Sequence, residues 1–321
     1  MRDAFGREIN YLRLSITDRC NLRCRYCMPK EGVPLVEHDA LLRYEELLEV
    51  ARAAVSCGID RFKVTGGEPL LRRGCADFVR ELKALPGVRQ VTLTTNGLLL
   101  LSQLDALTAA GLNGVNISLD TLDDRQYADI TRRNFQPSAV VSAIEQCAER
   151  LPTKVNAVLL PETADQLIPL ARLAERLPVD VRFIEQMPVG QQKISPRMCD
   201  PLACLREVWP DLTAVEERRG NGPAHYYGSS ALLGRIGFIE ALHHVFCDEC
   251  NRLRLTATGV LKPCLCYEAG ISLRPVLRGN GDHTAALQRC FAEALARKPQ
   301  AHCFGKNEES IERNTMNRIG G

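Results

Sequence analysis

The sequence predicts an α/β protein built on a parallel sheet with helices outside it. Short β-rich runs alternate with helical patterns up to about residue 187, and such repeated strand–helix units are typical of a parallel sheet. Six units are too few for a complete eight-unit barrel, so the pattern is compatible with a partial barrel or an open sheet. A chain of 321 residues suffices for one large domain with an appendage, or for two domains.

The predicted elements follow from short β-rich runs and from apolar residues at helical spacing. The expected strands are residues 11–17, 61–65, 90–95, 114–119, 154–160 and 180–186. The expected helices are residues 44–57, 75–86, 102–111, 137–151 and 164–177. From 188 to about 235, clusters of Pro, Gly and charge indicate loops or a linker. We therefore expect two domains, 1–235 and a cysteine-rich 236–321, the latter ending in a solvated helix or flexible tail.

Several expected strands carry polar residues on one face, although buried parallel strands are usually apolar on both. Alternation with period two places the members of each set together: Arg13, Ser15 and Thr17; Lys63 and Thr65; Thr92, Thr94 and Asn96; Asn116, Ser118 and Asp120; Lys154 and Asn156. A solvated edge explains one such strand but not five in succession. We expect a polar interior that faces a bound ligand.

The composition excludes several function classes. The net charge of +2 favours neither nucleic-acid nor membrane binding, and no apolar run is long enough to span a membrane. The first residues do not resemble a secretory signal, so we expect a cytoplasmic protein. In a reducing compartment, clustered cysteines among a total of 14 indicate metal or redox chemistry.

The stretch CNLRCRYC contains Cys20, Cys24 and Cys27 in eight positions. Structural zinc sites need four ligands and usually draw cysteines in pairs. Three thiolates in one short loop can instead bind three irons of a cubane cluster and leave the fourth iron open. This C-x3-C-x2-C spacing, followed by GGEP (66–69) after the second expected strand, resembles the radical S-adenosylmethionine (SAM) superfamily.

A second group contains Cys247, Cys250 and Cys264. Its spacing alone leaves a structural zinc site open, with His243, His244 or Cys266 as a fourth ligand. The surrounding CNRLRLT and KPCL, together with LTTNG, NISLD, FIEQMPVG and the terminal Gly320-Gly321, resemble the GTP 3′,8-cyclase branch of the superfamily, which serves molybdenum cofactor biosynthesis. The resemblance covers nearly the whole chain.

The resemblance implies a partial (βα)6 TIM-type barrel with a C-terminal iron–sulfur extension, two [4Fe-4S] clusters and SAM. In that branch a 5′-deoxyadenosyl radical removes hydrogen from C3′ of GTP, and C3′ then bonds to C8. Matching SAM contacts are Tyr26, Gly67, Ser118 and Met187. Matching substrate contacts are Arg13, Lys63, Thr94, Lys154, Arg252, Leu253 and Arg254. Lysine at 63, where the branch often has arginine, keeps the charge but loses the planar fork.

Arginines suit bidentate phosphate contacts, and the i, i+2 pair Arg252 and Arg254 would project from one strand face. In the resembling family the final glycines, here Gly320 and Gly321, enter the active site beside these arginines and are needed for catalysis.

The resemblance also implies two partners, a reductant for the clusters and a downstream cyclic pyranopterin synthase. A monomer and a homodimer are both compatible with the sequence.

Two alternatives remain at this point. One is another radical SAM enzyme with an auxiliary cluster, such as a peptide maturase, which has no need of the arginine pair or the Gly-Gly terminus. The other is a non-enzymatic zinc or redox-sensing protein, which explains the cysteines but not GGEP or the polar strand faces.

Overall fold

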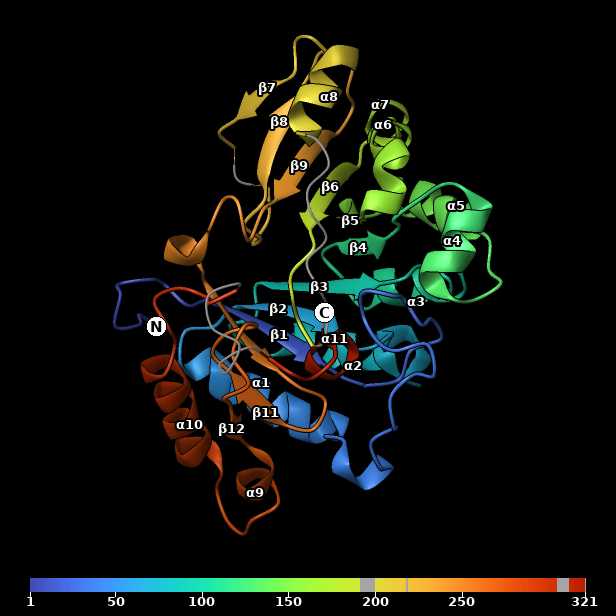
Figure 1. Ribbon diagram of the computed structural model, residues 1–321. Coiled ribbons are helices and arrows are strands. Elements are labelled where there is room, and N and C mark those ends of the chain that lie inside the picture. Colours follow the sequence, from blue (N-terminus) through green and yellow to red (C-terminus); the bar gives the residue numbers. More distant parts are fainter. Residues whose placement is uncertain (191–199, 218, 305–311, 321) are drawn as a thin grey trace.

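A computed structural model describes residues 1–190, 200–217, 219–304 and 312–320. Its strands form one sheet in the order β12-β11-β10-β1-β2-β3-β4-β5-β6-β9-β8-β7 (Figure 1). The strands are β1 (Tyr11–Ser15), β2 (Arg61–Thr65), β3 (Gln90–Thr95), β4 (Val115–Ser118), β5 (Thr153–Leu159), β6 (Asp180–Glu185), β7 (Thr213–Val215), β8 (His225–Gly228), β9 (Arg235–Ile239), β10 (Arg252–Leu255), β11 (Val260–Lys262) and β12 (Ile271–Ser272).

The first six strands form the predicted parallel series. Neighbours from β1 to β6 all pair in parallel, and helices lie between successive strands. These are α1 (Tyr44–Ser56), α2 (Cys75–Ala84), α3 (Leu104–Ala109), α4 (Asp124–Thr131), α5 (Pro137–Ala148), α6 (Leu167–Ala171) and α7 (Leu173–Arg176). The sheet does not close on itself, and the fold is the expected partial (βα)6 barrel with a C-terminal extension.

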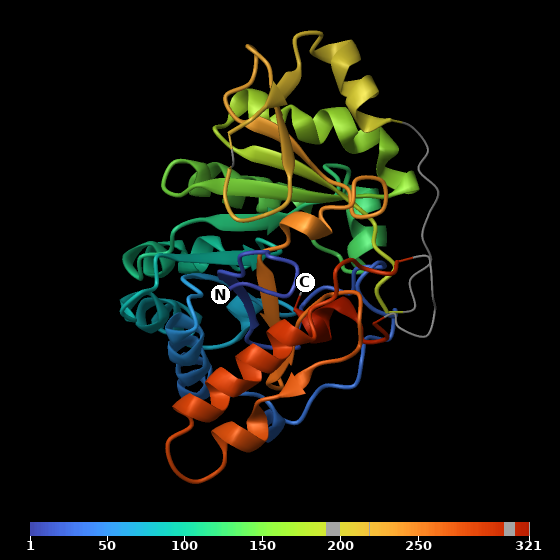
Figure 2. The ribbon, with the colours of Figure 1, turned by 90° about the vertical axis from the view of Figure 1, so that its left-hand side faces the viewer.

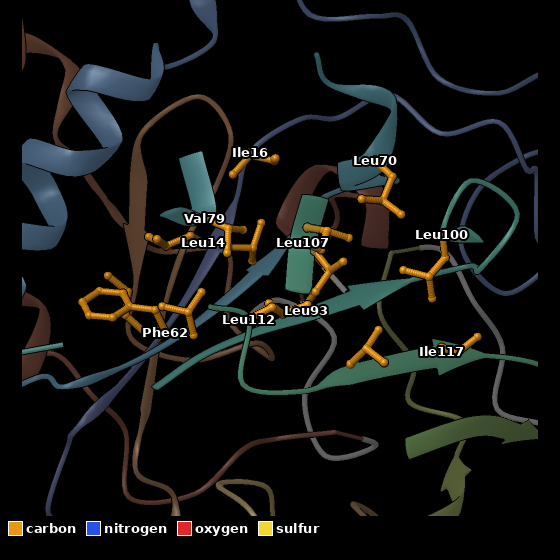
Figure 3. Close-up of a cluster of buried hydrophobic side chains, with 14 of the residues drawn as sticks. Leu14, Ile16, Phe62, Leu70, Val79, Leu93, Leu100, Leu107, Leu112 and Ile117 are labelled. Carbon is orange, nitrogen blue, oxygen red and sulfur yellow. The ribbon is translucent and has the colours of Figure 1, made fainter. Parts of the chain in front are cut away.

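The core lies between the apolar faces of the strands and the helices that cover them. On β3, the buried residues alternate with half-buried ones, so Val91 and Leu93 face the helices while Thr92 and Thr94 face the other side. Figure 3 shows Leu14, Phe62, Leu93 and Ile117, from four adjacent strands, gathered with side chains such as Val79 of α2 and Leu107 of α3.

The remaining elements extend the sheet at both ends (Figure 2). At one end β9 pairs in parallel with β6, followed by the antiparallel strands β8 and β7. At the other end β10 pairs in parallel with β1, followed by β11 and β12. The helices here are α8 (Pro201–Val208), α9 (Arg274–Leu277), α10 (Thr284–Ala296) and α11 (Met316–Ile319). Strand β9 contains both residue 235 and residue 236, so the sheet is continuous across the expected domain boundary. The division into two domains stays a prediction.

Three expectations about elements were wrong. Part of the predicted linker is ordered, since α8, β7 and β8 lie within residues 188–235; each is so short that its loop-like composition hid it. The helix α4 was missed because only Tyr127 and Ile130 supply apolar periodicity in it. The described part of the tail is not solvated, because Glu312, Asn317 and Ile319 are buried. Within the described ranges, no helix has the length and apolar character needed to cross a bilayer.

Candidate active site

The first cysteine group lies in the loop that follows β1, and α4 supports this loop. The backbone N–H groups of Arg23 and Arg25 donate to the carbonyl oxygens of Thr131 and Ile130, each over 2.9 Å. These carbonyls lie at the C-terminal end of α4 and are free to accept because a helix leaves its last carbonyls unpaired. The helix missed by sequence reasoning therefore fixes the cysteine loop.

The thiols of this loop fit a bound cationic group better than an empty site. Burial raises the pKa of Cys20 to about 12. A hydrogen bond shared with Cys27, together with burial, raises the pKa of Cys24 well above its usual value. Without a ligand Cys20 and Cys24 therefore stay neutral, whereas bound iron deprotonates coordinating thiols.

The GGEP segment packs against the backbone that leads into this loop. The N–H of Gly67 donates to Thr17 O and that of Glu68 to Arg19 O, both over 2.7 Å. A Cβ on Gly67 would lie 2.3 Å from Arg19 O, so a side chain is excluded there. Glu68 is fully buried and accepts from Leu70, Thr95 and Asn96; burial raises its pKa to about 7.

A carboxylate lies beside the cysteine loop at the end of β4. The Tyr26 hydroxyl donates to Asp120 Oδ2 over 2.7 Å, and the Val158 N–H donates to Oδ1 over 2.8 Å. Burial raises the pKa of Asp120 to about 6. The carboxylate of Asp120 thus orients the side chain of Tyr26, which is one of the predicted SAM contacts.

The second cysteine group lies around β10 and β11, in the C-terminal extension. Each thiol sulfur accepts at least one N–H of the described residues: Cys247 from His302 N at 3.4 Å, Cys250 from Lys298 Nζ at 3.4 Å and Cys264 from Cys266 N at 3.5 Å. Although burial raises the pKa of Cys250, the nearby cations Arg252 and Lys298 lower it to about 6.

Among the described residues, no three His, Cys, Asp or Glu side chains converge as the ligands of a single metal ion do. The thiolates of a cubane bind different irons and need not converge in that way. Both three-cysteine groups line one cavity of about 390 Å³. The predicted SAM contacts Tyr26, Gly67, Ser118 and Met187 line it too.

Cations gather on the cavity side of three adjacent strands. Arg13 of β1 lies opposite Lys63 of β2 and Arg254 of β10 in the sheet register, and Tyr11 of β1 lies opposite Arg252 of β10. Arg13, Lys63, Arg252 and Arg254 all line the cavity. The predicted polar interior is therefore strongly cationic.

Holding these positive charges close together inside the protein is energetically costly unless an anion is bound. Burial lowers the pKa of Arg13, and Arg252 and Arg182 lower it further. Burial lowers the pKa of Lys63 well below its usual value, with Arg13 and Arg182 adding to the effect. Burial and neighbouring arginines lower the pKa of Arg254 to about 9. The Nε atoms of Arg13 and Arg252 and the hydroxyl of Thr94 are buried without a hydrogen-bond partner, which suits a ligand rich in acceptor oxygens.

Sequence reasoning missed Arg182 on β6. It lines the cavity and donates from Nε to Asn156 Oδ1 over 2.9 Å. The period-two rule could have found it, because Arg182 lies opposite Asn156 in the register. Lys154 also lines the cavity, but its ammonium is held by Asp180 at 3.1 Å and by the Tyr226 hydroxyl at 2.9 Å.

Leu253 stays a predicted substrate contact, which would have to be made through its backbone. Its side chain is fully buried in the hydrophobic core, because alternation along β10 points it away from the face of Arg252 and Arg254. Gly320 does reach the site: Arg254 Nη1 donates to its carbonyl oxygen over 3.0 Å. The short helix α11 that leads to Gly320 accordingly lies near the middle of the molecule (Figure 1). Gly321 lies outside the described residues.

The sequence matches two family models. Residues 14–174 match the radical SAM superfamily, and residues 179–304 match Molybdenum Cofactor Synthesis C. Proteins named GTP 3′,8-cyclase from Moorella thermoacetica and Clostridium perfringens are 42% and 38% identical to this chain. Both alignments cover all of each chain.

Solved structures share the fold at low identity. Streptococcus suis SuiB bound to S-adenosylmethionine gives a TM-score of 0.61 at 15% identity, over 92% of this chain and 73% of that one. Native anSMEcpe with bound AdoMet gives 0.57 at 17%, over 94% and 82%. Together with the two family models and the full-length relatives, these matches show that the chain belongs to the radical SAM superfamily and, within it, to the family of the GTP 3′,8-cyclases.

Proposed function

We propose that this protein converts GTP to (8S)-3′,8-cyclo-7,8-dihydroguanosine 5′-triphosphate, the first step of molybdenum cofactor biosynthesis. The observation that carries the proposal is the row of cations on β1, β2 and β10, which lines the same cavity as both three-cysteine groups. A triphosphate supplies the negative charge and acceptor oxygens that this row needs. Full-length relatives with the same named activity support the assignment.

The cofactors we propose are SAM and two [4Fe-4S] clusters. Membership of the radical SAM superfamily implies SAM and the first cluster, on Cys20, Cys24 and Cys27. The second, on Cys247, Cys250 and Cys264, is supported by their shared position at the cavity wall. When bound, the first cluster and SAM supply the 5′-deoxyadenosyl radical that takes hydrogen from the ribose.

The residues of the chain bind and orient the reactants. Tyr26, Gly67, Ser118 and Met187 would hold SAM beside the first cysteine group. Arg13, Lys63, Lys154, Arg252 and Arg254 would hold the triphosphate, and Thr94 a further polar group of the nucleotide. The carbonyl of Gly320 fixes the guanidinium of Arg254.

We also propose two partners for the protein. One is a one-electron reductant for the clusters, and the other is a cyclic pyranopterin synthase that would take the product. We propose the cytoplasm as the compartment, since its reducing conditions preserve thiolates.

A peptide maturase is the alternative that the fold leaves open. A peptide has no comparable concentration of negative charge, so it would leave the four cavity-lining cations of β1, β2 and β10 without an anion.

The proposal is tested by an anaerobic assay of the reconstituted protein with SAM, GTP and dithionite. Mass spectrometry follows 5′-deoxyadenosine and the nucleotide product. We expect both 5′-deoxyadenosine and a cyclised isomer of GTP. Production of 5′-deoxyadenosine with unchanged GTP would contradict the assignment of GTP as the substrate and would favour a peptide substrate instead.

A further inference from the structure

Lys298 is a buried lysine just beyond the end of α10, and its function is not explained by the substrate site. Only 4% of its surface is exposed. Three acceptors surround Nζ: Pro263 O at 2.8 Å, Arg252 O at 2.9 Å and Cys250 Sγ at 3.4 Å. An ammonium has three donors, so this geometry uses all of them.

Of these three acceptors, only the Cys250 sulfur can carry a negative charge. Two other buried cations near the second cysteine group have carboxylate partners: Arg7 pairs with Asp3 at 2.6 Å, and Lys262 pairs with Glu312. A buried ammonium is costly unless an opposite charge compensates it. The charge of Lys298 is therefore explained if Cys250 is a thiolate.

Lys298 also lies behind the cysteines rather than in the cavity. Its three partners Cys250, Arg252 and Pro263 line the cavity, while Lys298 is not among the described residues that do. It cannot contact a substrate there. Instead it joins the segment of Cys250 to Pro263, the residue before Cys264, and so holds two parts of the second cysteine group together.

We propose that Lys298 is the counter-charge of the second cysteine group, and that it positions the group and raises the reduction potential of the cluster bound there. The inference rests on the second cluster of the proposed function. One-electron reduction adds a negative charge to a cluster, and a nearby ammonium stabilises that added charge. Among the described residues that donate an N–H to the three thiols, Lys298 is the one with a charged donor, whereas His302 and Cys266 donate from the backbone.

The test uses the full chain with Cys20, Cys24 and Cys27 replaced by Ala, so that every cluster signal belongs to the second group. After anaerobic reconstitution, iron and acid-labile sulfide are counted, and a redox titration with dithionite is followed by electron paramagnetic resonance. Variants are Lys298→Met, which removes charge and donors, Lys298→Gln, which keeps a donor, and Lys298→Arg, which keeps the charge. Arg297→Met is the matched control, since Arg297 is the exposed neighbour.

We expect Met and Gln at 298 to shift the midpoint potential to more negative values, and Arg at 298 and the Arg297 control to leave it near that of the parent. Loss of the cluster in the Met and Gln variants with retention in the Arg variant would also support a counter-charge. Equal potentials in all variants would overturn the inference while leaving the second cluster in place. Absence of iron and sulfide from the parent would overturn both the inference about Lys298 and the proposed second cluster. The experiment therefore distinguishes a failure of the inference from a failure of the proposed function.

Discussion

Arg254 Nη1 donates a hydrogen bond to the carbonyl oxygen of Gly320, although 66 residues separate them in the chain. The contact is buried and joins β10 to the C-terminal end of α11. The tail is further tied to the first cysteine loop, because Asn317 Nδ2 donates to Asp18 O over 2.9 Å and the Met316 N–H donates to Cys27 O over 3.3 Å. The tail is thus part of the active-site wall.

Deletion of Gly320 and Gly321 should abolish cyclisation while leaving both clusters intact, because it removes the acceptor that orients Arg254. Product formation is measured by mass spectrometry, and iron and sulfide are counted. Full activity of the truncated protein would contradict the prediction.

Gly320→Ala should reduce turnover at least about tenfold. The added Cβ would lie 2.7 Å from the Ser15 Cβ, and the φ of +86° is strained for alanine. Gly281→Ala is the matched control, because Gly281 has a φ of +99° but open space around its Cα. Equal losses in the two variants would attribute the effect to backbone strain alone.

Glu312→Gln should release the tail, because it leaves the ammonium of Lys262 buried without its partner. Both side chains of this ion pair are almost fully buried, and breaking such a pair costs about 3–5 kcal/mol. Hydrogen exchange of residues 312–320 should rise and cyclisation fall. Glu293→Gln, which breaks an exposed pair with Arg297, should change neither.

Arg182→Met should raise the KM for GTP by about 10- to 100-fold, since a hydrogen bond to a charged group contributes about 1.5–3 kcal/mol. The exposed Arg176 on α7, changed to Met, is the control. Steady-state kinetics over a range of GTP concentrations separates KM from kcat. An unchanged KM would exclude Arg182 from the substrate site.

Lys63 should contribute to the stability of the nucleotide-free protein a term that rises with pH in the alkaline range. The pKa of Lys63 is lowered in the folded state from 10.5, so between the lowered value and 10.5 the unfolded chain binds a proton that the folded chain does not. The contribution of Lys63 to stability therefore increases with pH across that window. Urea unfolding at several pH values measures the slope, which should be smaller in Lys63→Met. An identical slope in the variant would show that Lys63 is not responsible.

The sequence predicted the parts of the fold that depend on local periodicity. The parallel strands β1–β6 appear within a few residues of their expected bounds, because alternation of side chains along each strand is a local property. The same rule placed Arg13, Lys63 and Thr94 at the cavity. It also explains why the side chain of Leu253 points away from the face of Arg252 and Arg254.

What the sequence could not predict depends on contacts between distant segments. The pairing of β10 with β1 and the support of the cysteine loop by α4 have no local signal. The burial of the tail likewise rests on partners far away in the chain, such as Lys262 for Glu312 and Asp18 for Asn317. Arg182 had the local signal, because it shares a strand face with Asp180, but Val181 and Phe183 on either side of it resemble an ordinary buried strand.

The pairing of β10 with β1 affects how the chain folds during its own synthesis on the ribosome. While the chain emerges from the ribosome, β1 can pair with β2 on one side, but its other edge must wait until residues 252–255 have been made. An unpaired edge strand is a template for pairing with other chains, and such long-range closure is slow. The nascent protein is therefore vulnerable to aggregation until nearly four-fifths of it has been translated, and its folding should depend on chaperones that protect a bare sheet edge.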